Sequence, residues 1–325
     1  HMEYRKLGKT GLKVSPLCMG TMQFGWSVNE ADTHRILSAT LDSGINFIDT
    51  ADVYSKWVEG NAGGVAETYI GNWMKKNKIP RDQVVLATKV RGEMGKGPND
   101  QGLSRIHIMQ AVEASLRRLQ TEYIDLYQSH WTDEDTPIEE TLRVFDDLVK
   151  QGKVRYVGAS NYAAWELMQA LWTSDKHNLV RYNCLQPHYS MIYRDEFERE
   201  LRAVCETYGV GVIPYSPLAG GFLTGKYRKN GPLPESKRAE GRKRAMTDKN
   251  FALIDEMDVI ALRHKASIPQ VALAWMLADP VITSPIIGAT SIEQLNDNLG
   301  ALNVKLSEDE MILLNKMAAW KEDEE

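Results

Sequence analysis

Four side chains that can transfer or stabilise a proton lie in or just after three apolar, β-rich runs. Asp49 lies in the run NFIDTA and Tyr54 follows it, Lys89 lies in VVLATKV, and His130 ends YIDLYQSH. Taken alone, an aspartate that leaves a strand is usually a turn former, and a histidine there is as often a satisfied core imidazole. Lys89 is harder to explain in this way, because its neighbours are those of a buried strand.

Lys89 predicts the chemistry of the group. An unpaired ammonium in a barrel mouth is costly to desolvate, so we expect Asp49 from the neighbouring strand end to pair with it. A cation beside a phenol favours the phenolate, so Lys89 should lower the pKa of Tyr54 and make it a general acid. A neutral His130 would hold a substrate carbonyl oxygen by a hydrogen bond. Asp52 is expected to serve the turn rather than the chemistry.

Alternating strand and helix patterns must position these residues. Strands joined by crossover helices are parallel, so eight such units predict a closed (β/α)8 TIM barrel, an α/β fold with its active site at the carboxyl ends of the strands. The doubly wound alternative lacks its GxGxxG fingerprint, since the first strand ends in GTMQFG. The expected helices span 31–43, 65–76, 104–119, 138–150, 164–173, 196–207 and 251–264, and the expected strands begin at Val14, Asn46, Val84, Tyr123, Val154, Tyr182, Gly209 and Ser284.

Two elements are expected outside the eight units. Residues 4–14 are typical of a β-hairpin, with its turn between Gly8 and Gly11, that plugs one mouth of the barrel. A helix over 308–318, capped by Ser307, should pack against the outside. No linker composition interrupts the chain, so we expect one domain over residues 1–325, in which residues 1–2 are typical of a tag remnant.

Composition limits the function classes. A net charge of −5 gives no global attraction to nucleic acid or to an anionic membrane, so a small soluble substrate is favoured. The cysteines form no CxxC pair, which argues against a disulfide framework or a zinc site, and we expect no metal. No apolar run approaches the ~18 residues of a membrane span, so a cytoplasmic protein without a membrane partner is expected. A homo-oligomer is compatible with the composition, which does not determine the oligomeric state.

The four residues stand in motifs that resemble the aldo-keto reductase superfamily over residues 4–318. The motifs are LGKTGLKVSPLCMGTM, NFIDTADVY, LATKV, LRRLQTEYIDLYQSHW, VGASN, YSPLAGGFLTGKY and IIGATSIEQLNDN. The resemblance implies a catalytic tetrad of Asp49, Tyr54, Lys89 and His130, the same residues as above. It further implies reversible reduction of an aldehyde or ketone by hydride from NADPH, with Tyr54 protonating the oxygen and no metal ion.

The resemblance also implies where the cofactor binds. Tyr215 would stack on the nicotinamide, and Ser160, Asn161 and Gln186 would bind its carboxamide. The other implied contacts are backbone groups of Gly20, Thr21 and Met22 near the nicotinamide, a pyrophosphate loop of Ser216, Leu218, Gly220, Gly221 and Lys226, and an adenosine site of Gly288, Thr290, Gln294 and Asn298.

A cofactor with a 2′-phosphate is favoured over NADH. Thr290 and Ser291 open a helix, whose N-terminus attracts phosphate. A solvated loop is the ordinary explanation of a basic run, but segment 227–249 is too long for an ordinary βα loop, and such long loops are usually functional or disordered. Arg238 is the preferred 2′-phosphate ligand among its basic residues, which include Lys237, Arg238, Arg242, Lys243 and Arg244.

Three tryptophans follow strand ends and are candidates for the substrate pocket. Trp26, Trp57 and Trp131 would line it for an apolar or aromatic carbonyl compound, and packing at the rim is their alternative role. One departure from the family pattern concerns the wall of this pocket. Ser55 stands where many relatives have a glycine after the catalytic tyrosine, and KWVEGNAGGV precedes Glu67.

Two other functions stay open. Lys89 beside a tyrosine also suits a Schiff-base aldolase, although the nucleotide-binding pattern and a carboxylate that keeps Lys89 charged argue against it. The YSPLAGG and GATS segments are similar to those of potassium-channel β subunits, which bind NADPH and attach to a membrane channel. The short region before the hairpin argues against that regulatory role. The physiological substrate is decided by pocket loops that the sequence does not place in space.

Overall fold

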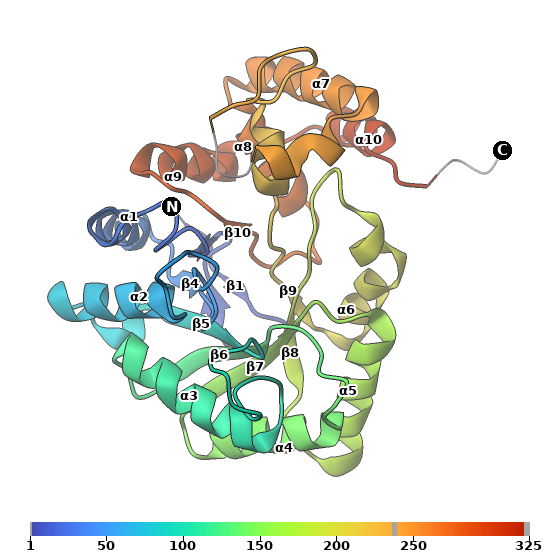
Figure 1. Ribbon diagram of the computed structural model, residues 1–325. Coiled ribbons are helices and arrows are strands. Elements are labelled where there is room, and N and C mark those ends of the chain that lie inside the picture. Colours follow the sequence, from blue (N-terminus) through green and yellow to red (C-terminus); the bar gives the residue numbers. More distant parts are fainter. Residues whose placement is uncertain (1, 236–238, 322–325) are drawn as a thin grey trace.

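Parallel β-strands form the centre of the computed structural model, which describes residues 2–235 and 239–321 (Figure 1). Their order in the sheet is β10-β3-β4-β5-β6-β7-β8-β9, and every neighbouring pair is parallel. The strands are β3 (Cys18–Gly20), β4 (Phe47–Asp49), β5 (Val85–Val90), β6 (Ile124–Ser129), β7 (Val154–Ser160), β8 (Tyr182–Gln186), β9 (Gly211–Val212) and β10 (Ile286–Ile287).

Hydrogen bonds between the two outermost strands close this sheet. The Ile286 amide donates to the Pro214 carbonyl at 2.9 Å, and the Thr283 amide donates to the Val212 carbonyl at 2.8 Å. Val212 also forms an isolated parallel bridge with Ile282. The predicted (β/α)8 fold is therefore confirmed, and the residues at the carboxyl ends of its strands meet at one mouth.

Helices surround the strands and begin at caps that the sequence supplies. Asn29, Ser104 and Ser307 each accept a hydrogen bond from a backbone amide of the first turn, and Glu310 completes a capping box with Ser307. The helices are α1 (Glu30–Asp42), α2 (Val65–Lys76), α3 (Arg105–Leu119), α4 (Ile138–Lys150), α5 (Ala164–His177), α6 (Arg202–Tyr208), α7 (Asp248–His264), α8 (Ile268–Leu277), α9 (Ile292–Leu299) and α10 (Glu308–Met317).

Helix α8 was not among the predicted elements. Its sequence IPQVALAWML is almost entirely apolar, and most of its side chains are buried. A helix that is buried on nearly all sides shows no amphipathic period, so the pattern that identifies surface helices is missing. The predicted helix at 251–264 is α7, which packs against α8 and α10 in the upper part of Figure 1. The predicted helix at 196–207 begins as a π-helical turn, Phe197–Leu201, and continues as α6.

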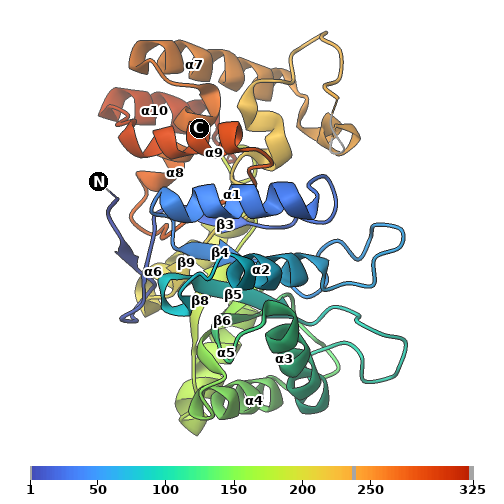
Figure 2. The same cartoon turned by 90° about the vertical axis from the view of Figure 1, so that its left-hand side faces the viewer.

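The predicted hairpin plugs the amino end of the barrel. Strands β1 (Arg5–Lys6) and β2 (Lys13–Val14) pair antiparallel, and Leu7 lies fully buried in a cluster with residues of the barrel strands. Gly8 has φ +57°, and a Cβ there would lie 2.7 to 2.8 Å from backbone atoms of the barrel, so only glycine fits this contact. In Figure 2 the hairpin lies to the left, and long loops after the strands extend to the right. Among the helices of the described segments, none has the length and apolar composition to cross a bilayer.

Candidate active site

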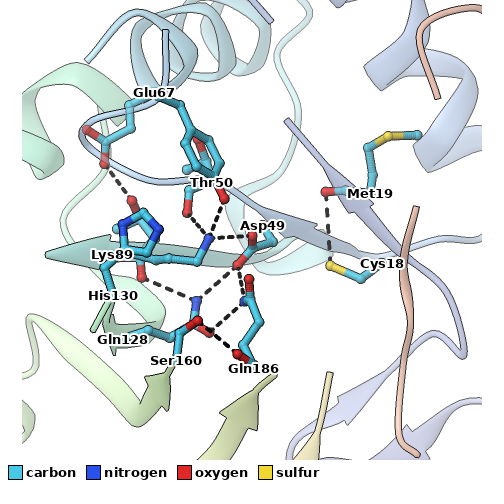
Figure 3. Close-up of polar contacts among 12 residues, drawn as sticks. Cys18, Met19, Asp49, Thr50, Glu67, Lys89, Gln128, His130, Ser160 and Gln186 are labelled. Atoms are coloured by element: carbon cyan, nitrogen blue, oxygen red, sulfur yellow. Dashed lines mark hydrogen bonds and ion pairs between the residues drawn. The ribbon is translucent and has the colours of Figure 1, made fainter. Parts of the chain in front are cut away.

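Lys89 lies at the centre of the site and is 1% exposed (Figure 3). It belongs to β5, in which every residue is buried, and alternation along the strand points its side chain into the barrel. Its Nζ atom donates to Asp49 Oδ2 at 2.6 Å, to Tyr54 Oη at 2.8 Å and to the Thr50 carbonyl at 3.0 Å. The predicted pairing of Lys89 with Asp49 is confirmed, and the same ammonium reaches the phenol.

Two buried glutamines hold the second oxygen of Asp49. Gln128 on β6 and Gln186 on β8 each donate an amide hydrogen to Asp49 Oδ1 at 3.0 Å, and Gln186 also donates to Gln128 Oε1 at 2.9 Å. The sequence analysis missed Gln128. The available signal was its spacing, because Gln128 precedes His130 by two positions and residues two apart on a strand share a face.

Burial and charge set opposite trends in the pKa values of this group. Burial lowers the pKa of Lys89, but the charges of Asp49 and Tyr54 outweigh it, so the pKa lies above its ordinary value and the ammonium stays charged. Burial raises the pKa of Tyr54, and the Lys89 charge lowers it only in part. The predicted net lowering is therefore wrong, although Lys89 acts in the predicted direction. Tyr54 is protonated at neutral pH, which is the form that donates a proton.

His130 completes the group as a neutral imidazole. Its ring centroid lies 6.0 Å from that of Tyr54, with an interplanar angle of 79°. Burial and then the positive charge of Lys89 hold the pKa of His130 well below its usual range. Its buried Nδ1 has no hydrogen-bond partner in the described parts of the chain. Asp49, Tyr54, Lys89 and His130, predicted from three separate strand ends, thus lie together.

The loop that carries Tyr54 is held by Ser55. Ser55 adopts φ +68°, a left-handed conformation that favours glycine. Its buried hydroxyl donates to the Phe24 carbonyl at 2.7 Å. Asn61 Nδ2 lies 3.1 Å from the Ser55 carbonyl and 3.2 Å from the Gly25 carbonyl. These contacts give a physical reason for a serine at a position whose backbone favours glycine, because its side chain ties two rim loops together.

The three candidate pocket tryptophans flank the acid–base group, defined as Asp49, Tyr54, Lys89 and His130. The rings of Trp26 and Trp57 meet edge to face with centroids 5.7 Å apart, and Trp57 lies 6.4 Å from the Tyr54 ring. Trp131 lies 4.9 Å from the His130 ring. Trp57 is half exposed. The rim of the site is therefore aromatic next to both Tyr54 and His130.

The predicted nicotinamide contacts gather beside His130. Tyr215 Oη donates to Asn161 Oδ1 at 2.7 Å, and Asn161 Nδ2 donates to the His130 carbonyl at 3.0 Å. The Ser160 hydroxyl donates to the Gln186 carbonyl at 2.8 Å. On the other side of the barrel mouth, Gly20 pairs with Asp49 in the sheet, Thr21 follows with a buried hydroxyl that has no partner in the described residues, and Met22 comes next.

The predicted pyrophosphate loop is a tight turn with a left-handed backbone at several positions. Ser216, Ala219, Gly220 and Gly221 all have positive φ, between +52° and +102°, and the amides of Ala219 and Gly221 donate to the carbonyls of Ser216 and Leu218 within the loop. Arg242 Nη1 lies 2.5 Å from the position of a Cβ on Gly220. The Lys226 ammonium lies 3.1 Å from that position on Gly221. Small residues here let cations approach the loop, a combination that fits a phosphate group. Leu218 lies within the same turn.

The predicted adenosine residues lie before and along α9, from Gly288 ahead of the helix to Asn298 in its last turn. Ser291 is the N-cap of α9 and accepts from the Gln294 amide, as the sequence predicted. Both the amide and the hydroxyl of Thr290 donate to Gln294 Oε1, at 2.9 and 3.0 Å. Gly288 is exposed with open space at its Cβ position, and Asn298 is buried. Arg238 lies outside the described residues.

Comparison with known proteins agrees with this geometry. The model of the aldo/keto reductase family matches residues 16–319. The chain belongs to the aldo/keto reductase family. This family membership makes it an oxidoreductase that works with a nicotinamide cofactor.

Two relatives of this aldo/keto reductase illustrate the range of related proteins. The chain is 40% identical over 319 residues to the uncharacterized oxidoreductase YrpG of Bacillus subtilis (strain 168), an alignment that covers 97% of the chain and 95% of the relative. It is 36% identical over 310 residues to a probable voltage-gated potassium channel subunit beta of Arabidopsis thaliana, which covers 93% and 92%, respectively. The chain is thus similar both to an oxidoreductase and to a probable channel subunit, so the geometry of the site is needed to argue for catalysis or for a regulatory role.

Proposed function

We propose that this aldo/keto reductase reduces aldehydes or ketones to alcohols with NADPH and that Tyr54 is the general acid. The observation that carries the proposal is the arrangement around Lys89, whose ammonium contacts both the Asp49 carboxylate and the Tyr54 hydroxyl, at 2.6 and 2.8 Å. A buried, permanently charged lysine stabilises the phenolate that remains after proton transfer. Without this cation, loss of a proton from a buried phenol would be strongly unfavourable.

Each residue of the tetrad has a separate part in this reaction. Bound NADPH supplies hydride to the carbonyl carbon. Tyr54 Oη gives its proton to the carbonyl oxygen, and the neutral His130 imidazole donates a hydrogen bond that orients this oxygen. Asp49 keeps Lys89 charged and fixes the position of its ammonium. Solvent at the open mouth returns a proton to Tyr54 for the next cycle.

The cofactor contacts are part of the same proposal. Tyr215 would stack on the nicotinamide, with Ser160, Asn161 and Gln186 at its carboxamide. The loop 216–221 would hold the pyrophosphate, and Lys226 and Arg242 support this because they border its glycines. The basic segment that includes Arg238 favours a 2′-phosphate, and hence NADPH over NADH.

The substrate class is proposed from the rim of the site. Trp26 and Trp57 pack against each other beside Tyr54, and Trp131 packs beside His130. A carbonyl oxygen held between Tyr54 and His130 would leave the rest of the substrate against these rings. This arrangement favours an apolar or aromatic aldehyde over a small charged one.

Replacing Tyr54 by phenylalanine tests the proposed proton donor. The Tyr54→Phe variant should bind NADPH as the wild type does but lose about 10²- to 10⁴-fold of its reductase activity, because only the hydroxyl is removed. NADPH oxidation would be followed over a panel of aromatic and aliphatic aldehydes, with NADH in parallel. Equal turnover by both proteins would refute the assignment of Tyr54.

A regulatory role is the second candidate, and the similarity to the probable channel β subunit of Arabidopsis thaliana is the observation that favours it. In that case wild type and Tyr54→Phe would both bind NADPH tightly and neither would reduce any aldehyde.

A Schiff-base aldolase is disfavoured because Lys89 is charged and bound to Asp49. Trapping with borohydride in the presence of a carbonyl compound would reveal such an imine as a covalent adduct on Lys89, and we expect none.

A further inference from the structure

Three aromatic rings lie face to face next to the proposed nicotinamide site. The His188 and Tyr215 ring centroids are 5.2 Å apart and the rings are nearly parallel, at 11°. Tyr193 covers the other side of His188, with centroids 3.9 Å apart and an angle of 21°. The imidazole is thus enclosed between two phenol rings. The sequence analysis singled out Tyr215 and assigned no role to His188 or Tyr193.

Backbone contacts fix the order of these rings. His188 and Tyr215 form a parallel bridge, and the Tyr215 amide donates to the Pro187 carbonyl at 2.9 Å. A tight turn follows, in which Ser190 and Tyr193 exchange two backbone hydrogen bonds of 3.2 Å. This turn folds Tyr193 back onto His188. The backbone beyond β8 and β9 therefore brings the three rings together.

The stack is connected to the acid–base group at its other end. The hydroxyl of Tyr215 donates to Asn161, and Asn161 donates to the carbonyl of His130. A shift of the Tyr215 ring would therefore change the position of the His130 backbone through these two hydrogen bonds. His188 lies directly behind Tyr215 and supports the ring across its face.

We infer that His188 is a positioning residue that supports Tyr215 and sets the relative affinity of the site for oxidised and reduced cofactor. The inference rests on the proposed function, because it requires the nicotinamide to stack on the face of Tyr215 opposite His188. The nicotinamide ring is positively charged in NADP⁺ and neutral in NADPH. An imidazolium behind Tyr215 repels the charged ring and leaves the neutral one almost unaffected.

His188 is the member of the stack whose ordinary pKa lies closest to neutral. Burial raises the pKa of Tyr193 to about 12 and that of Tyr215 to about 12, so both phenols stay neutral. Burial lowers the pKa of His188 from its ordinary value, the Glu196 carboxylate opposes this shift, and the Arg242 guanidinium adds to it. His188 is therefore neutral at pH 8 and gains its charge only as the pH falls.

The inference is tested by measuring the dissociation constants of NADP⁺ and NADPH by calorimetry between pH 5 and pH 8. The useful quantity is the dissociation constant of NADP⁺ divided by that of NADPH, because titration of the 2′-phosphate that both share cancels in this ratio. For the wild type this ratio should rise about fivefold as the pH falls, because two charges separated by a ring repel each other through a partly solvated site. The His188→Phe and His188→Gln variants should give a ratio that does not change with pH.

A matched control is His177→Gln, because His177 ends α5 and pairs with Glu139 away from the stack. It should keep the pH dependence of the wild type. A pH dependence in His188→Phe and His188→Gln equal to that of the wild type would overturn the inference. Failure of NADP⁺ and NADPH to bind the wild type at any pH would instead refute the proposed function.

A second measurement is made on the wild-type protein and uses a variant only to assign the His188 signal. Because linkage is reciprocal, NADP⁺ must lower the pKa of His188 more than NADPH does. Nuclear magnetic resonance of the histidine ring protons reports this directly, with the His188 signal assigned by its loss in His188→Gln. The same pKa of His188 in both complexes would overturn the inference.

Discussion

Two buried ion pairs lie on opposite faces of β5. On the inner face, Lys89 pairs with Asp49 at 2.6 Å. On the outer face, Arg118 of α3 pairs with Glu67 of α2 at 2.8 Å, and the Thr88 hydroxyl donates to the same Glu67 carboxylate at 2.7 Å. Thr88 and Lys89 are neighbours in sequence, and successive side chains of a strand point to opposite faces. Lys89 therefore joins the inner pair and Thr88 joins the outer one.

The two pairs differ in what their cations contact. Both oxygens of each carboxylate are bonded, since Asp49 accepts from Lys89, Gln128 and Gln186, and Glu67 accepts from Arg118 and Thr88. In the inner pair, however, the Lys89 ammonium also contacts Tyr54 at the barrel mouth. The outer pair contacts Thr88 and packs between two helices and the strand. A buried ion pair alone therefore does not indicate an active site; the inner one differs because its cation contacts Tyr54, the proposed proton donor.

The largest effect is expected from replacing the inner cation. Lys89→Met should lower carbonyl reduction by about 10²- to 10⁴-fold, because the phenolate of Tyr54 loses its stabilising charge. It should also lower the free energy of unfolding by about 3–5 kcal/mol, because Asp49 is left buried without a counter-ion. Activity would be followed by NADPH oxidation and stability by urea unfolding.

A double variant separates these two effects. Lys89→Met combined with Asp49→Leu removes both charges, so most of the lost stability should return while the activity stays low. Recovery of activity together with stability would mean that Lys89 acts only through the fold. That outcome would remove the distinction between the inner and outer pairs.

The outer cation should matter for the fold alone. Arg118→Met leaves Glu67, which is fully buried, without its cation and should lower the free energy of unfolding by about 3–5 kcal/mol. The value of kcat for the folded protein should change less than threefold, because no atom of this pair reaches Tyr54. The neutral pair Arg118→Met with Glu67→Gln serves as the control and should recover part of the stability. A loss of kcat as large as that of Lys89→Met would contradict the comparison.

The sequence was sufficient for the inner pair and insufficient for the outer one. Motifs and strand ends brought Asp49 and Lys89 together because each lies on its own strand, and strand ends converge in a barrel. The outer pair depends on which faces of α2 and α3 meet, and helical spacing does not determine this. Gln128 on β6 was missed for a similar reason, since its contact with Asp49 on β4 reaches across the intervening strand β5.

Other differences have their own physical causes. Helix α8 was missed because complete burial removes amphipathic spacing. The pKa of Tyr54 was predicted in the wrong direction because a sequence shows which charge is near but not how deeply the phenol is buried. The stack around His188 depends on a turn that reverses the chain over only four residues, 190–193, and no pattern in the sequence predicts that two rings will meet there.

A third test concerns Asp52, which lies buried near the outer pair. Neither of its carboxylate oxygens has a hydrogen-bond partner within residues 2–235 and 239–321. Burial and then the negative charge of Glu67 raise the pKa of Asp52 well above its ordinary value, so the folded protein keeps a proton that the unfolded chain releases. The stability from this proton is complete below about pH 4, the unfolded pKa, and is lost as the pH rises toward the folded pKa.

Asp52→Asn should remove this dependence. Relative to the variant, the wild type should lose about 1.4 kcal/mol of unfolding free energy for each pH unit above pH 4, until the folded pKa is reached. Urea unfolding at several pH values between 4.5 and 7.5 measures the difference, in which the effects of all other groups cancel. Parallel curves for the two proteins would show that Asp52 is ionised in the folded state.

The smallest effect is expected at Thr88, and it tests the comparison most closely because Thr88 is adjacent to Lys89. Thr88→Val keeps the shape of the side chain and removes only the donor to Glu67, so the free energy of unfolding should fall by about 1–1.5 kcal/mol. The kcat value should change less than twofold, because the hydroxyl lies on the face of β5 away from Tyr54. If kcat fell tenfold or more in a protein that unfolds cooperatively, the outer network would be acting on the position of Lys89 through the strand, and the two faces of β5 would form one functional unit.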